Sequence, residues 1–456
     1  MRDSTTTPCV LFPELFDRSL SATFDVPHAS SDGGAVLLTA ADRRLNLIPQ
    51  LTAALEDGRQ HGKVRHGLDD LLAQRIYGLA LGYEDANDAA RLADDPMHKL
   101  LLGRDPVAGD ALASQPTLSR FENGVTRGEL LALGAAHFEA VLARHARRRR
   151  KVRRITIDLD VTDDATYGAQ QLTFFNGFYG TWCYLPLLAF LTFDREAEQY
   201  LCAAVLRPGN APTQRGALPL LKRIVVRLQE RFPKARILVR LDGGYAEPEL
   251  FEFLDEVGLD YVVGLPKNAV LERLAALDLL EARMRSLASG HTEHVYADFS
   301  YAAGTWDRAR RVVVKAEVVQ LKGREPRDNP RFVVTNLKRS PRRIYQRIYC
   351  ARGELENRLK ELFDVALDRT SCPRFGANQL RVTLAAAAYA LLQELRLAAR
   401  GTAWARAQVA TLRLELLKIG VLVVASVRRL RLRLPEAFPF REGWCRIALQ
   451  SGASPG

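Results

Sequence analysis

The predicted fold rests on one short stretch of the chain, Ile155-Thr156-Ile157-Asp158-Leu159-Asp160-Val161. Its apolar residues alternate with polar ones, which is the pattern of a β-strand with one apolar face. Asp158 and Asp160 share the polar face, because side chains two residues apart on a strand point the same way. The stretch therefore predicts a strand that carries two carboxylates on one face.

The residues after this strand predict a mixed α/β core. The expected elements are strands at 183–193 and 199–206, a helix at 218–232, a strand at 236–242, a helix at 247–256 and a strand at 261–265. The first three strands are expected to form an antiparallel meander, and the full order is βββαβαβ. Right-handed crossovers leave few compact ways to wind that order, and a ribonuclease-H-like fold is the one that fits.

The remaining chain predicts an insertion and two helical ends. Apolar runs at 294–301, 311–319 and 331–335 indicate a β-rich insertion, and later runs indicate helices at 354–367, 380–397 and 405–427. The predicted regions are 1–150, helical and DNA-binding; 151–266, the first part of the ribonuclease-H-like core; 267–345, the insertion; 346–400, the catalytic helix and the rest of the core; and 401–456, a helical C-terminal region suited to dimerisation.

Composition bounds the class of protein. The 456 residues are 47% hydrophobic, which excludes disorder of the whole chain, and 65 Lys and Arg against 53 Asp and Glu leave a net charge of +12. Such a balance favours a polyanionic partner, although a solvated basic surface explains charge alone equally well. The six cysteines show no paired spacing, and no apolar run is long enough to cross a bilayer, so we expect a cytoplasmic protein without a membrane partner.

Two N-terminal features are candidates for DNA contact. Residues 114–124 resemble the second helix of a helix-turn-helix, whose Arg120 would reach DNA; an ordinary packed helix is an equally open interpretation. The basic run Arg147–Arg154 either contacts phosphate or forms a solvated linker.

Three carboxylates fall where the predicted core would bring them together. Asp160 lies on the first strand, Asp242 ends the fourth, and Glu356 lies on the helix after the insertion. Two Mg²⁺ ions that activate a nucleophile and neutralise a phosphodiester transition state need hard oxygen ligands from separate segments. Each residue also has a plainer interpretation: Asp158 shares the face of Asp160, Asp242 precedes two glycines in a turn, and Glu356 suits a solvated helix surface.

A family resemblance joins these residues. The segment Tyr349-Cys350-Ala351-Arg352-Gly353-Glu354-Leu355-Glu356 is similar to the Tyr-x2-Arg-x3-Glu signature of bacterial insertion-sequence DDE transposases of the cut-and-paste type. Asp160-Val161-Thr162 resembles the first aspartate motif of that family, and Arg240-Leu241-Asp242-Gly243-Gly244-Tyr245 resembles the second. The block between Asp242 and Glu356 is similar to the insertion of the subgroup that makes hairpin ends. The resemblance covers nearly the whole chain.

The resemblance implies a role for each matching residue. Asp160, Asp242 and Glu356 would be catalytic and hold Mg²⁺, with Mn²⁺ as a substitute. Tyr349 and Arg352 would contact phosphate at the cut end.

Two further positions enter through the same resemblance. The family signature has a lysine seven residues after its glutamate, where this chain has Phe363; Lys360, one helical turn after Glu356, is the substitute if the helix is continuous. Trp306, inside the insertion, would stack on a flipped base, with packing in the insertion's own core as the plainer interpretation. Trp182 and Tyr184 are expected in the core.

The resemblance implies a transposase that binds terminal inverted repeats, cleaves phosphodiester bonds at transposon ends and joins the 3′-hydroxyl ends to target DNA as a homodimer in a synaptic complex. Two alternatives stay open: a catalytically inactive, sequence-specific DNA-binding derivative, and a stand-alone ribonuclease-H-like nuclease. The chain lacks the phosphate loop, the HExxH motif and the GxSxG motif, which leaves other hydrolase classes without support.

Overall fold

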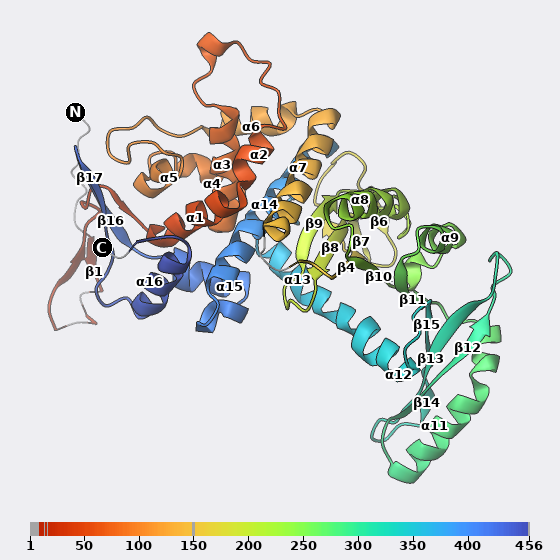
Figure 1. Ribbon diagram of the computed structural model, residues 1–456. Helices are drawn as coiled ribbons and strands as arrows, with labels where there is room; N and C mark the ends of the chain where they lie inside the picture. Colours follow the sequence, from red (N-terminus) through yellow and green to blue (C-terminus); the bar gives the residue numbers. More distant parts are fainter. Residues whose placement is uncertain (1–8, 13, 16, 148–150, 455–456) are drawn as a thin grey trace.

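The computed structural model describes residues 9–12, 14–15, 17–147 and 151–454. Figure 1 shows an elongated molecule in which a helical part, a central sheet and the insertion follow one another. Strands β16 (Val421–Ser426) and β17 (Arg429–Arg433) lie in the helical part, and the insertion lies at the opposite end of the molecule.

A mixed sheet forms the centre of the molecule. Its core strands are β4 (Arg154–Val161), β8 (Leu187–Phe193), β9 (Tyr200–Val205), β10 (Arg236–Leu241) and β11 (Asp260–Leu265), and the connecting helices are α8 (Ala217–Arg231) and α9 (Pro248–Glu256). β4 runs parallel to β10, β10 runs parallel to β11, and β8 pairs antiparallel with both β4 and β9. The elements therefore occur in the order that the sequence predicts. Because β4 and β10 are parallel, their carboxyl ends meet at one edge of the sheet.

The core places the aspartates of β4 on the side away from α8. Ile157 and Leu159 are fully buried and belong to the same apolar cluster as Leu221 and Leu228 of α8. Side chains alternate along a strand, so Asp158 and Asp160 point to the other face of the sheet. This alternation places both carboxylates on the face of the sheet that α8 does not cover.

The predicted strand at 183–193 is broken in two. β7 (Thr181–Tyr184) ends before Pro186, which cannot donate a backbone hydrogen bond, and β7 instead forms a small sheet with β5 (Asp164–Ala165) and β6 (Phe174–Asn176). Tyr184 is buried, as the sequence predicts, but the prediction for Trp182 is wrong, because 55% of that side chain is exposed. Trp182 lies opposite Phe175 in the hairpin of β6 and β7, and the two rings meet edge-on.

The insertion is built from both helices and strands. It begins with α10 (Ala269–Leu274) and α11 (Ala276–Ser289), and continues with β12 (Glu293–Tyr301), β13 (Arg310–Val319), β14 (Arg327–Asp328) and β15 (Arg331–Thr335). β15 pairs antiparallel with β11, so over the described residues the main path of the sheet is β12-β13-β15-β11-β10-β4-β8-β9. The insertion is therefore an extension of the central sheet and carries a helix on one side.

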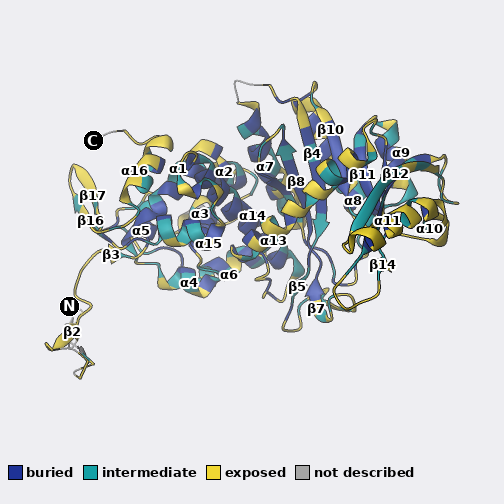
Figure 2. Ribbon diagram, turned by 90° about the horizontal axis from the view of Figure 1, so that it is seen from below, coloured by how far each residue is buried: buried dark blue, intermediate teal, exposed yellow. Residues whose placement is uncertain are grey.

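One long helix near the end of the chain packs against the N-terminal helices. α14 (Phe375–Ala398) is buried along most of its length, as Figure 2 shows, and its apolar residues share a cluster with α1 (Val36–Leu45), α3 (Leu68–Ala80) and α7 (Arg127–Ala146). The predicted regions 1–150 and 346–400 thus share one core. Arg396 of α14 also pairs with Glu361, which fixes the helix α13 (Leu355–Phe363) against α14.

The prediction of a helix at 405–427 is wrong. Short helical turns end at Leu417, and the chain then forms the antiparallel hairpin of β16 (Val421–Ser426) and β17 (Arg429–Arg433). β16 also pairs with β3 (Ala29–Ser30), which ties the two ends of the chain together before the final helix α16 (Arg441–Gln450). The alternation of valines in β16 suits a strand with one buried face. The C-terminal region is therefore mixed and not purely helical.

Residues 115–124 form the expected helix α6 (Gln115–Gly124), but not in a helix-turn-helix. The preceding helix α5 (Pro96–Leu101) is separated from it by a long loop, where a helix-turn-helix has a turn of three or four residues. Glu122 of α6 is buried between Arg75 and Arg381, at 2.8 and 2.9 Å. Among the described residues no helix combines the length and the apolar character that crossing a membrane requires.

Candidate active site

Asp160 and Asp242 come together at the edge where β4 and β10 end. Asp160 is near the end of β4, and Asp242 directly follows β10. The Nη2 atom of Arg352 lies 2.9 Å from Oδ1 of Asp160 and 3.3 Å from Oδ2 of Asp242. The same nitrogen donates to the backbone oxygen of Leu159 at 3.2 Å. One guanidinium therefore bridges two carboxylates that come from different strands.

Asp158 is engaged in a separate interaction. Its two carboxylate oxygens accept hydrogen bonds of 2.8 and 2.7 Å from Arg240, and both side chains are buried. Arg240 lies directly opposite Asp158 in the parallel pair of β10 and β4, and it also donates to the backbone oxygen of Ile348 at 2.9 Å. Both carboxylate oxygens of Asp158 thus have a hydrogen-bond donor inside the protein. This contact favours Asp160 over Asp158 as the residue that faces a substrate.

Burial and charge act in opposite directions in this cluster. Burial raises the pKa of Asp160, the nearby guanidinium of Arg352 works against that rise, and repulsion from Asp242 adds to it. Burial works to lower the pKa of Arg352, but the carboxylates of Asp160 and Asp242 outweigh it, so its pKa is raised. Arg352 therefore stays charged and compensates the two carboxylates. Its Nε atom is buried without a partner among the described residues.

Three tyrosines, Tyr179, Tyr245 and Tyr349, lie near enough to the carboxylates to feel their charge. A Cβ at Gly264 would lie 2.7 Å from the hydroxyl of Tyr349, so the glycine lets this phenol approach the backbone beside Asp242. Burial raises the pKa of Tyr179 and Tyr245, and the charge of Asp160 adds to the rise in both. These hydroxyls remain protonated at neutral pH and are available as hydrogen-bond donors beside the carboxylates.

The structure does not bring Glu356 to Asp160 and Asp242. Glu356 is exposed in the first turn of α13 and forms no hydrogen bond or ion pair with the described residues. No group of three or more potential metal ligands occurs in the described part of the chain. Lys360 is also exposed, one turn further along the same helix. The two residues share a helix face, whereas Arg352 belongs to a differently wound segment.

The helical run that carries the signature is uninterrupted but not uniform. A π-helical turn (Ile344–Tyr349) is followed by a 3₁₀ turn (Cys350–Glu354), and α13 begins at Leu355. Arg352 lies in the 3₁₀ turn, three residues before α13 begins at Leu355. Changes of winding inside a helix are common at functional hinges. The pitch of the 3₁₀ turn sets the angle about the helix axis between the side chains of Arg352 and Glu356.

Trp306 is partly buried and packs against the core of the central sheet. Its ring contacts Phe251 of α9 and Tyr301 of β12 at centroid distances of 5.2 and 5.4 Å, and the guanidinium of Arg310 lies 5.4 Å from the ring. These contacts hold the start of β13 against α9. The structure therefore places this side chain in a packed cluster, and its predicted contact with a flipped base has no support in this geometry.

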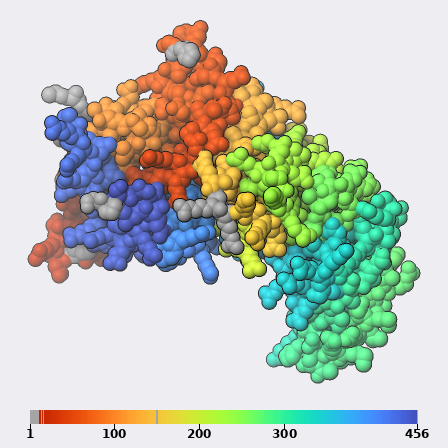
Figure 3. Space-filling model, viewed as in Figure 1, coloured from red at the N-terminus to blue at the C-terminus, as the bar shows by residue number. Residues whose placement is uncertain are grey.

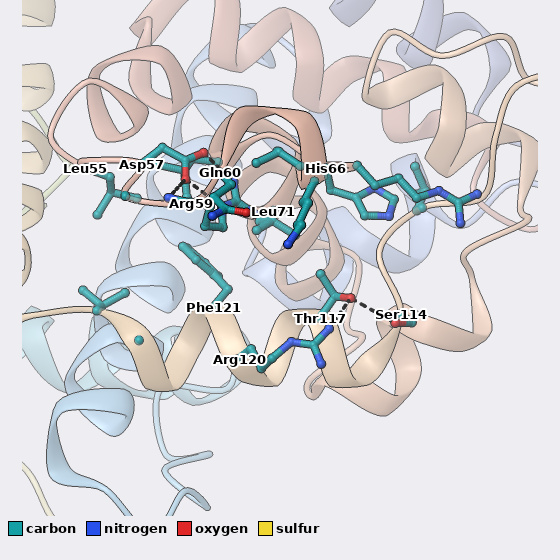
Figure 4. A pocket seen from close by; sticks show the side chains of 18 of the residues that line it. Leu55, Asp57, Arg59, Gln60, His66, Leu71, Ser114, Thr117, Arg120 and Phe121 are labelled. Carbon is teal, nitrogen blue, oxygen red and sulfur yellow. Dashed lines mark hydrogen bonds and ion pairs between the residues drawn. The ribbon is translucent and has the colours of Figure 1, made fainter.

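Arg120 lines a cleft whose residues all come from the part of the chain before β4. The cleft has a volume of about 940 Å³ and lies between the loop 55–68 and α6, as Figure 4 shows. Arg59, on the loop side, is held by Asp57 at 2.7 and 2.6 Å. Arg120 is exposed and contacts Thr117 at 3.3 Å, and it has no acidic partner in the described ranges. It remains a candidate for DNA contact on its own helix face.

The basic run Arg147–Arg154 lies only partly within the described residues, because residues 148–150 are outside them. Arg147 donates to the backbone oxygen of Arg44 at 3.1 Å, and Arg153 and Arg154 are exposed at the start of β4. Its predicted contact with phosphate stays a prediction.

Three residues near the carboxylates were not predicted from the sequence: Arg240, Tyr245 and Tyr179. Arg240 was quoted only as part of a motif, although its position opposite Asp158 was readable from the predicted register of two parallel strands. Tyr245 had a similar signal, three residues after Asp242. Tyr179 had none, because the hairpin of β6 and β7 that carries it was not predicted.

The two aspartates of β4 should differ in their effect on stability. We expect Asp158→Asn to destabilise the protein by about 3–5 kcal/mol, because it leaves the buried Arg240 without its counter-charge. Asp160→Asn should cost less than about 1 kcal/mol, because Asp242 still compensates Arg352. Urea unfolding in the presence of a chelator measures both. Equal losses of stability in the two variants would contradict the assignment of Asp158 to a structural pair.

Comparisons with known proteins bear on this site. Residues 12–450 match the family model described as transposase DDE domain group 1. No curated protein matches the chain. Among solved structures, a piggyBac transposase synaptic complex with hairpin DNA matches with a TM-score of 0.36 and 10% identity, over 80% of this chain and 74% of that chain.

The family match extends from the N-terminal strands to the last helix and includes Asp160, Asp242 and Arg352. It confirms a DDE transposase family, while the bacterial insertion-sequence origin and the Tyr-x2-Arg-x3-Glu signature stay predictions. The chain belongs to the transposase DDE domain group 1 family.

Proposed function

We propose that this transposase binds terminal inverted repeats, cleaves phosphodiester bonds at transposon ends and joins the 3′-hydroxyl ends to target DNA. The observation that carries the proposal is the pair Asp160 and Asp242, held around one cationic group at the end of two parallel strands. The order of β9, β8, β4, β10 and β11 supports a ribonuclease-H-like core around this pair. A homodimer in a synaptic complex, acting in the cytoplasm, is part of the same proposal.

The carboxylate pair suits a divalent metal. Asp160 and Asp242 offer hard oxygen ligands, and the guanidinium that lies between them supports a site that binds positive charge. We propose that they hold Mg²⁺, or Mn²⁺ in its place, together with Glu356. The metal ions would activate the attacking oxygen and neutralise charge on the scissile phosphate.

Arg352 would have two roles in this proposal. Without metal and DNA it compensates the charge of Asp160 and Asp242. When these carboxylates bind a metal, the guanidinium becomes available to a phosphate oxygen, for which its planar geometry is suited. Tyr349, whose hydroxyl lies beside the backbone of Gly264, would donate to the same phosphate, and Lys360 would contact the DNA one turn further along.

The winding of the signature helix supports a role for Glu356. Glu356 is the second residue after the 3₁₀ turn Cys350–Glu354, so a change of pitch in this turn would move both Glu356 and Arg352. We propose that Arg352 leaves the carboxylates and Glu356 approaches them in a single rearrangement of this turn.

Cleavage should depend on the carboxylates, whereas binding of end DNA should not. We expect Asp242→Asn and Glu356→Gln each to lower the rate of Mg²⁺-dependent nicking by more than the 10–100-fold that is typical of losing an outer partner of a metal site. The measurement is nicking of duplex DNA from the flanks of the coding sequence, with binding measured on the same duplex by gel shift.

Glu354→Gln is the matched control for Glu356→Gln, because both residues are exposed and lie two positions apart. It should nick DNA like the unaltered protein. Full activity of Asp242→Asn would overturn the proposed site. Binding without nicking by the unaltered protein would favour the inactive DNA-binding derivative, and nicking that needs no paired ends would favour the stand-alone nuclease.

Removal of the Arg352 side chain should increase the stabilisation that the protein gains from Mg²⁺. We expect Arg352→Gln to unfold at a lower temperature without metal, because Asp160 and Asp242 then repel each other uncompensated. Mg²⁺ should stabilise this variant more than the unaltered protein, by about 1.4 kcal/mol for each tenfold excess over the dissociation constant. Thermal unfolding with and without Mg²⁺ gives the comparison. An identical Mg²⁺ effect in both proteins would show that Arg352 and metal do not compete.

A further inference from the structure

The hairpin of β16 and β17 presents a row of arginines that the active site does not use. Arg429, Arg431 and Arg433 alternate along β17 and are all exposed. Their strand partners on β16 are Ser426, Val424 and Leu422. Residues directly opposite each other in an antiparallel pair share a face, so this face carries three positive charges and no negative one.

The opposite face of the hairpin anchors it to the protein. Leu432 and Leu434 pack against a buried cluster of Met97, Val421 and Val423. β16 is tied further by its pairing with β3 and by a hydrogen bond of 3.0 Å from the backbone of Val423 to that of His28. The arginine row is therefore held on a fixed platform, and its geometry is set before any partner arrives.

The arginines have no internal counter-charges. No acidic residue occurs between Glu415 and Glu436 in the sequence. The three side chains form neither ion pairs nor side-chain hydrogen bonds with the described residues, whereas the nearby Lys418 is paired with Asp32 at 2.8 Å. A cluster of like charges at one face is unfavourable in the free protein. It becomes favourable when an anionic partner compensates the charges.

We propose that this face, which we name the arginine ribbon (Arg429, Arg431 and Arg433), binds the phosphate backbone of a DNA duplex. The inference rests on the proposed function, because it assumes that DNA is the substrate. Arginines two residues apart on an antiparallel strand are roughly 6.8 Å apart, about twice the axial rise of 3.4 Å per phosphate on one DNA strand.

The position of the arginine ribbon determines which part of a bound duplex it would contact. Figures 1 and 3 show β16 and β17 at one end of the molecule, with the insertion at the other and the central sheet between them. DNA that contacts the ribbon while its cut end lies at Asp160 and Asp242 must extend along the helical part of the protein. The ribbon thus adds affinity at base pairs away from the cut, and phosphate contacts of this kind do not depend on base sequence.

A second copy of the chain is the competing occupant, because β17 is an edge strand. Charged residues on an edge strand oppose pairing with another edge. Two ribbons facing each other would also bring six guanidinium groups together without counter-charges. Charge complementarity therefore favours DNA over self-association.

The test compares salt dependence of DNA binding in the full-length chain. The variant Arg429→Ser/Arg431→Ser/Arg433→Ser should bind a labelled duplex from the flanks of the coding sequence, and a scrambled duplex, with a slope of log affinity against log salt that is shallower by about 2.7, from about 0.9 per phosphate contact. Affinity should fall on both duplexes by the same factor. Fluorescence anisotropy over a KCl series gives both quantities.

Two controls separate the outcomes. Arg223→Ser/Arg231→Ser/Lys234→Ser removes the same charge from exposed positions of α8 and the loop after it, and should change the slope by less than about 1. Arg429→Lys/Arg431→Lys/Arg433→Lys keeps the charge and should keep the slope. An unchanged slope in the serine variant, while the unaltered protein binds and nicks DNA, would overturn the inference and leave the proposed function intact.

Charge reversal addresses the role of the edge strand. Arg429→Glu/Arg431→Glu/Arg433→Glu retains a charged edge, so it should stay monodisperse in light scattering and bind DNA more weakly than the serine variant. DNA affinity unchanged in this variant would mean that the arginines only protect the edge. Failure of the unaltered protein to bind any duplex would overturn the proposed function together with the inference.

Discussion

Repulsion between two carboxylates is the constraint on which the site depends. Parallel pairing of β4 and β10 brings Asp160 and Asp242 to one edge of the sheet, where their charges must be compensated. Arg352 supplies that compensation from a helix that follows the insertion, about 110 residues further along the chain than Asp242. The contact therefore ties the two parts of the core together across the insertion, and it couples the position of the signature helix to the charge state of the carboxylates.

The strand pattern of the core was predictable because it is local. Ile155 to Val161 alternates so regularly that both the strand and the shared face of its aspartates follow from spacing alone. The C-terminal hairpin was missed because an apolar run such as Val421 to Ser426 fits a buried helix as well as a strand, and only pairing with β3 decides between them. Trp182 was misplaced for a similar reason, since burial of an aromatic residue depends on which hairpin face meets the core.

The site itself was predictable in part. The motifs predicted Asp160 and Asp242 as site residues, and the structure places both beside Arg352. The sequence could not choose between Asp158 and Asp160, because the contact that engages Asp158 comes from Arg240, which lies opposite it in the register of two strands. The separation of Glu356 from Asp160 and Asp242 could not be read from the sequence either, because it depends on the pitch of the turn before it. A helix that passes from π to 3₁₀ to α winding shifts side chains relative to the regular spacing that a motif assumes.

We propose that the position filled by the guanidinium of Arg352 is where the transposase binds its metal. Crystals of the protein with end DNA and Mn²⁺, recorded at the manganese absorption edge, test it most directly. The account predicts anomalous peaks between the carboxylates of Asp160 and Asp242, with Glu356 as a further ligand and Arg352 turned to a phosphate. Manganese bound elsewhere, with Arg352 still bridging Asp160 and Asp242, would contradict it.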